Sequence, residues 1–116
     1  MTRVDILSAA DHVVTVLDSV GIPAAVDPAE VELPGAWVSV TEVDLFALGG
    51  GGTVKVDVYL IAPDTMPRTA LAILSDLAET ALTVLDVDRM TTNDALQLPD
   101  GGRPMPAFKL TTKVEV

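Results

Sequence analysis

The stretch that decides the fold is GGGGTVKVDVYLIAP, from Gly49 to Pro63. Four consecutive glycines are typical either of a loop that binds phosphate or of a loop that lets the chain turn. A phosphate loop leads directly into a helix, whose free backbone N–H groups and positive dipole end point at the anion. Here Val54, Val56, Val58 and Leu60 instead alternate with Lys55, Asp57 and Tyr59, which is the period of a half-buried strand. Lys55 is also followed by neither Ser nor Thr, so the stretch does not match the nucleotide-binding motifs. We therefore interpret the glycines as the loop of a β-hairpin.

Length and composition predict one domain over residues 1–116, with a single core. The chain has no cysteine, which excludes disulfides, thiol nucleophiles and thiolate metal sites. The most apolar stretch beyond the N-terminal region, residues 70–85, is interrupted by Asp76 and Glu79, so we expect no membrane-spanning segment. Although 49% of the residues are hydrophobic, only 3% are aromatic, and we interpret the aliphatic excess as surface that meets another subunit.

The charge balance is strongly acidic. Seventeen acidic and seven basic residues give a net charge of -10, and the acids are scattered along the chain. Such a surface repels nucleic acid, because phosphate binding depends on clustered Lys and Arg. Arg68, Arg89 and Arg103 are isolated in the sequence, so we expect no basic patch and no nucleic-acid platform. An acidic wall would instead let DNA slide past without sticking.

The first half of the chain predicts a helix and then a strand. A capping box at Thr2 and Asp5 begins a helix over about residues 3–20, and glycine and proline at 21 and 23 end it. Its expected packed face is Ile6, Ala10, Val13, Leu17 and Val20. A proline-rich connector, 22–35, has room for one short extended piece at 24–27. In the strand expected at 36–48, strict alternation would place Val38 and Val40 on the same face as Glu42 and Asp44. This conflict predicts a bulge or an exposed extension.

The second half predicts another helix and two strands. Asp64 or Thr65 caps the helix, Pro67 fits its first turn, and the expected packed face is Leu71, Leu74, Ala78, Ala81 and Leu85. A ragged strand at 88–98, a turn-rich loop at 99–106 and an alternating strand at 108–116 follow. The order α-β-β-α-β-β, with hairpins, predicts an α+β fold. We expect a mainly antiparallel sheet of about four to five strands, covered on one face by two helices.

Residues that could carry chemistry are few. His12, the only histidine, shares a helix stripe with Ser8 and Asp5, but no Gly-x-Ser-x-Gly elbow occurs, and a solvated polar face accounts for the stripe better. Three acid pairs have the spacing that aims two carboxylates the same way from a strand: Glu42 with Asp44, Glu30 with Glu32, and Asp86 with Asp88. Such pairs arise by chance in an acidic chain. We therefore expect no catalytic residue, no cofactor and no metal site.

Four segments carry a family resemblance that covers nearly the whole chain: GIPAAVDPAEVELPGAWVSV, VKVDVYLIAPD, ALAILSDLAETAL and LPDGGRPMPAFKLTTKVEV. In element order and in short phrases such as PAFKLT and VDVYLIAP, the chain resembles the small tail terminator (tail-completion) proteins of long-tailed bacteriophages, especially those that infect actinobacteria. The resemblance implies a non-enzymatic homo-oligomer, usually a hexameric ring, that caps the tail tube, ends tail polymerisation and offers a surface to the head connector protein. It also implies assembly in the host cytoplasm, a place in the virion tail, and DNA that passes through the channel without specific binding.

Two sets of residues are candidates in such a ring. Subunit contacts are expected from the loops that can reach a neighbour, because a closed ring needs heterologous contacts; they contain Phe46, Gly49, Gly50, Gly51, Gly52, Arg103 and Pro104. The acids expected to face the lumen are Glu42, Asp44 and Asp57. Two alternatives remain: another head-to-tail joining or minor tail protein, and a small acidic metal- or ligand-binding domain.

Overall fold

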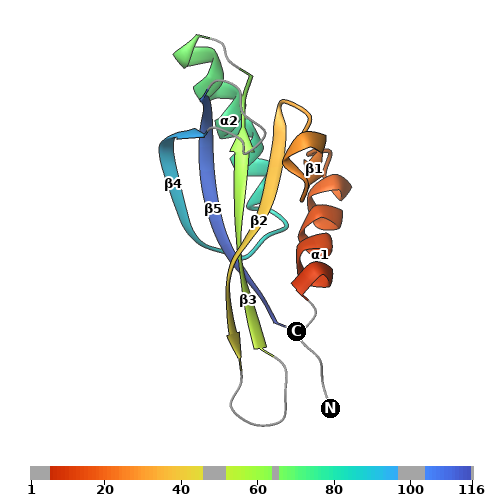
Figure 1. Cartoon of the computed structure of the whole chain (residues 1–116). Helices are drawn as coiled ribbons and strands as arrows, with labels where there is room; N and C mark the ends of the chain where they lie inside the picture. The colour runs from red at the N-terminus through yellow and green to blue at the C-terminus, as the bar shows by residue number, and fades with distance from the viewer. Residues whose placement is uncertain (1–5, 46–51, 64–65, 97–103, 116) are drawn as a thin grey trace.

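The computed structural model describes residues 6–45, 52–63, 66–96 and 104–115. Its elements, in chain order, are α1 (Ile6–Ser19), β1 (Ala24–Ala25), the 3-10 helix η1 (Pro28–Glu30), β2 (Gly35–Leu45), β3 (Gly52–Ile61), α2 (Pro67–Ala81), β4 (Val87–Leu96) and β5 (Met105–Glu115). Figure 1 shows α1 beside β1 and β2, and α2 behind β3 and β5. The expected α+β class with two helices is confirmed.

The sheet differs from the expected one in two respects. Its five strands lie in the order β1-β2-β3-β5-β4, and β1 pairs parallel with β2 while the other three pairings are antiparallel. The sheet is therefore mixed, and the expectation of a mainly antiparallel sheet is corrected. The order α-β-β-α-β-β is also corrected, because β1 and η1 precede β2. A strand of two residues shows no alternation in the sequence; it forms here beside Ala36, whose N–H donates to the carbonyl of Pro23 at 2.8 Å.

The core lies between the two helices and one face of the sheet. Its buried side chains include Ala9, Ala10, Val13 and Leu17 from α1, Ala70, Leu74, Ala78 and Ala81 from α2, and Val38, Val54, Val56, Val58, Leu60, Phe108 and Leu110 from the sheet. Each large aliphatic side chain buried in this way contributes about 1.5–3 kcal/mol. The expected burial is wrong for two residues of the packed faces. Leu71 is 53% exposed because it is turned about 100° from buried Ala70 around the helix, and Ile6, at the start of α1, is 44% exposed.

The expected irregularity in β2 is confirmed as a bulge. Pairing with β3 is regular up to Val40 and resumes at Glu42, which lies opposite Lys55. Thr41 is the extra residue, and its hydroxyl donates to the carbonyl oxygen of Lys55 at 3.3 Å. One extra residue reverses the phase of the alternation. Val43 therefore packs against the core, where the unbroken pattern would have placed Glu42.

The opposite side of the sheet is called here the helix-free face; it carries Trp37, Lys55, Asp57, Tyr59, Lys109 and Thr111. At its end near η1, the indole N–H of Trp37 donates to the carbonyl of Val26 at 3.0 Å. The Trp37 ring stacks on Tyr59 with centroids 5.3 Å apart. Val31 packs against Ile61 in the same small apolar cluster. The remainder of the face is polar, and it contains the site described next.

Candidate functional site

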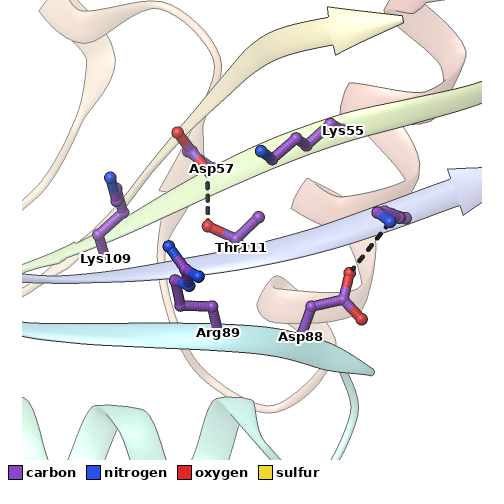
Figure 2. A pocket seen from close by; sticks show the side chains of 7 residues that line it. Lys55, Asp57, Asp88, Arg89, Lys109 and Thr111 are labelled. Atoms are coloured by element: carbon purple, nitrogen blue, oxygen red, sulfur yellow. Dashed lines mark hydrogen bonds and ion pairs between the residues drawn. The ribbon is translucent and has the colours of Figure 1, made fainter. Parts of the chain in front are cut away.

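A cleft of about 370 Å³ opens on the helix-free face. Its lining comes from β3, β4 and β5 and consists of Lys55, Asp57, Asp88, Arg89, Lys109, Thr111 and Lys113 (Figure 2). We call it the basic cleft, because four cationic side chains there face two carboxylates. Among the residues with described side chains, Arg68 is the only other lysine or arginine. In a chain with a net charge of -10, four of the five described lysine and arginine side chains therefore lie at one place.

The strand register explains this concentration. Residues directly opposite each other in an antiparallel pair point to the same face of the sheet. Lys55 lies opposite Lys113, and Asp57 lies opposite Thr111, which in turn is paired with Arg89. A register shift in β4 between Val87 and Arg89 precedes this last pairing. Paired residues that are between 22 (Arg89 and Thr111) and 58 (Lys55 and Lys113) positions apart in the chain thus meet because β5 lies between β3 and β4.

The centre of the cleft is a buried hydrogen bond between two side chains. The hydroxyl of Thr111 donates to the Oδ1 of Asp57 at 2.9 Å, as the dashed line in Figure 2 shows. The two residues are only 7% and 8% exposed. A hydrogen bond to a charged group contributes about 1.5–3 kcal/mol, more than one between neutral groups. This bond therefore fixes the carboxylate of Asp57 at the floor of the cleft.

The positive charge of the cleft is poorly neutralised within the chain. Lys55 and Lys113 carry like charges directly opposite each other, an arrangement that destabilises a sheet. Lys113 lies 3.9 Å from the Oδ2 of Asp88, but both side chains are at least half exposed, so the pair contributes at most about 1 kcal/mol. Within the described residues, no ion pair joins Lys55, Arg89 or Lys109 to a carboxylate. The cleft therefore presents three unpaired cations on one surface.

The structure places the expected lumen acids in two different environments. Glu42 and Asp44 are exposed on the part of β2 beyond the bulge, opposite Lys55 and Thr53. Asp57 is buried in the basic cleft instead. Their role at a lumen stays a prediction.

The expected subunit contacts fall mostly outside the described residues, where Phe46, Gly49, Gly50, Gly51 and Arg103 lie. Gly52 is buried at the start of β3, and Pro104 is exposed just before β5. Their role in subunit contacts stays a prediction.

The described residues that were weighed for chemistry lie on different elements of the fold. His12 is exposed on α1 and lines a second cleft of about 290 Å³, while Asp5 lies outside the described residues. Glu30 and Glu32 are both exposed. In the part of the chain that the structure describes, no three His, Asp or Glu side chains come together as a metal site, and no helix is long and apolar enough to cross a membrane.

The basic cleft is the feature that sequence reasoning missed. The expectation of no clustered cations is wrong for this face, because Arg89, isolated in the sequence, lines the same cleft as three lysines. One signal was available: Lys55, Lys109 and Lys113 all occupy the polar parity of two clearly alternating strands. What the sequence lacked was the pairing of those strands with each other.

Comparison with protein-family models and with curated proteins finds no match for this chain. The two clefts described above are both open to solvent.

Proposed function

We propose that the chain is the subunit of a homo-oligomeric ring that caps a bacteriophage tail tube, ends its polymerisation and offers a surface to the head connector. The observation that carries this proposal is the uncovered sheet. Among the described residues, no strand pairs with the outer side of β2 beyond Trp37 or with the outer side of β4, and no helix covers the basic cleft. A ring subunit needs two different free surfaces, because it contacts a neighbour on each side.

The shape and charge of the chain support the same role. The protein is elongated, measuring 51 × 30 × 22 Å, and is much longer in one direction than in the other two. Its net charge of -10 disfavours a grip on DNA, as a channel that DNA must pass through requires. Exposed Glu42 and Asp44 belong to the acids that would line such a channel. The role needs no catalysis and no cofactor.

The experiment is an assembly assay with the purified chain and the tail tube protein of the same phage. Light scattering after size exclusion and negative-stain images should show closed rings, free or at one end of the tubes. Adding the chain to growing tubes should fix their length, whereas tube protein alone continues to grow. Monomers as the only species, even with tubes present, would contradict the proposal.

Two measurements separate the nearest alternatives. In the assembly assay, a ring that binds the head connector but leaves tube growth unchanged would identify another head-to-tail joining protein. A small metal-binding domain would instead show a large rise in melting temperature with Mg²⁺ or Ca²⁺, because a specific ligand stabilises the native state in proportion to its occupancy. Loss of that rise in Glu42→Ala or Asp86→Ala would support this last alternative.

A further inference from the structure

The basic cleft is a surface whose charge is unsatisfied within one chain. Lys55, Arg89 and Lys109 have no ion-pair partner among the described residues, and the like charges of Lys55 and Lys113 face each other. Like charges directly opposite each other destabilise a sheet, and the four cations of the cleft outnumber the two carboxylates of Asp57 and Asp88. The cleft is also shallow and open, which suits a protein surface better than an enclosed small molecule. These features indicate a partner that carries carboxylates.

The chain itself presents such a surface on the outer side of α2. Asp76 and Glu79 are exposed there, and within the described residues neither carboxylate is hydrogen-bonded or ion-paired. Leu71 and Leu82, which precede and follow them in the chain, are 53% and 47% exposed. Leu71, Glu79 and Leu82 lie within about a quarter turn of one another at 3.6 residues per turn. Exposed apolar side chains interspersed with acids are typical of a protein contact.

The comparable surface of α1 is a poorer candidate. Asp18 is already used inside its own chain, because its Oδ1 accepts a hydrogen bond from the backbone N–H of Ala24 at 3.3 Å. Asp11, the other acidic residue of the described α1, is exposed beside His12. On α2, by contrast, both carboxylates are available to a partner.

Nucleic acid fits the cleft less well than a helix does. Phosphate binding needs a continuous basic stripe, whereas this cleft contains Asp57 at its floor and Asp88 at its rim. Acidic residues elsewhere on the chain, such as Glu42 beside Lys55, would repel a phosphate backbone that extends past the cleft. Separate carboxylates on a helix can instead meet separate lysines.

We propose that the basic cleft of one copy receives the outer side of α2 of the next copy, so that Asp76 and Glu79 meet Arg89 and Lys109. This inference rests on the proposed ring and names its subunit contact. The two surfaces lie on opposite sides of the sheet, so the contact is heterologous and leaves each copy with one free surface of each kind. A heterologous contact forms a ring where the rotation between neighbours closes, and the proposed ring requires such a rotation. The helices of one copy would then cover the helix-free face of its neighbour.

The test is a charge exchange across the contact. Arg89→Glu with Lys109→Glu, and separately Asp76→Lys with Glu79→Lys, should each weaken self-association at least about 10-fold, because like charges then meet. Mixing the two variants should restore assembly, since each then offers the charge that the other lacks. Glu30→Lys with Glu32→Lys changes the net charge as much as the α2 variant does, on other exposed residues, and should leave assembly unchanged. Circular dichroism verifies that each variant is folded.

The outcomes distinguish this inference from the proposed function. Wild-type rings together with rings of undiminished stability in both charge variants would overturn the contact and leave the ring intact. Failure of the mixture to assemble while each folded variant stays monomeric would also overturn it. A monomeric wild type that binds a 12-base-pair DNA duplex, and loses the duplex in the Arg89 and Lys109 variant, would assign the cleft to nucleic acid instead. Absence of wild-type rings with tail tubes present would refute the proposed function itself.

Discussion

The hydrogen bond from Thr111 to Asp57 allows a quantitative test of the cleft. Thr111→Val keeps the shape of the side chain but leaves a carboxylate that is 8% exposed without its hydroxyl donor. The expected cost is about 1.5–3 kcal/mol, the range for hydrogen bonds to charged groups. The neighbouring substitution Thr112→Val is the matched control. Thr112 is 3% exposed and donates to the neutral backbone oxygen of Asp86 at 2.7 Å, so its removal should cost about 0.5–1.5 kcal/mol.

Urea unfolding at fixed protein concentration measures both costs. With an m value of about 2 kcal/mol/M, Thr111→Val should lower the midpoint by about 1 M and Thr112→Val by about 0.5 M. In an Asp57→Ala background, the Thr111 substitution should lose most of its effect, with a coupling energy of about 1–2 kcal/mol. Equal midpoints for the two valine variants, or a coupling energy near zero, would refute the account of a charge held by this hydroxyl.

Three further predictions concern the frame that holds the cleft. Gly35→Ala should prevent folding or lower the free energy of unfolding by more than about 3 kcal/mol, because its Cβ would lie 2.7 Å from one backbone oxygen and closer still to another. Gly21→Ala has open space around its Cβ but a φ of 84°, so it should lower that free energy by only about 1–2 kcal/mol in thermal unfolding. Deleting Thr41 removes the bulge and keeps every valine in phase, so the melting temperature should change little. Deleting Ser39 instead exchanges the faces of the next two residues and should lower that temperature by several degrees; equal effects of the two deletions would contradict the bulge. Trp37→Phe removes the indole hydrogen bond at 3.0 Å and should cost about 1 kcal/mol, measured by urea unfolding; a neutral result would show that this bond does not hold the η1 segment.

The sequence was sufficient where periodicity is strong. Apolar and polar residues alternate from Val54 to Leu60 and, apart from Thr112, from Phe108 to Val114, so both strands could be predicted together with the face that packs on the core. The start of β5 at Met105 was missed, because residues 99–106 were expected to form a loop. The bulge in β2 was predictable as well, since valines and acids of one parity cannot both face the core. The positions of α1 and α2 followed from their apolar spacing. The expected cap of α2 at Asp64 or Thr65 is wrong, because Met66 is the N-cap and its side chain makes no capping hydrogen bond. The expected capping box of α1, Thr2 with Asp5, lies outside the described residues.

The remainder depends on contacts between distant segments. β1 falls within the short extended piece that was expected at 24–27, but the sequence holds no local signal for its parallel pairing with Ala36 and Trp37. The basic cleft depends on the insertion of β5 between β3 and β4, which chain order does not reveal. Leu71 appeared to belong to the packed face of α2 because its spacing from Leu74 is helical; the burial of Ala70 shows that the face is rotated by one residue.

The irregular pairing of β4 has a consequence for solubility. Its ladder with β5 shifts register twice, between Val87 and Arg89 and between Thr91 and Asp94. Such breaks bend and twist an edge strand. The unpaired backbone N–H and C=O groups of β4 therefore make a poor template for pairing with a strand of another molecule. A molecule with long, unprotected strand borders risks endless stacking into fibrils. The two register shifts make strand-to-strand stacking unfavourable at the outer edge of β4. They therefore favour a closed assembly that is held by side-chain contacts.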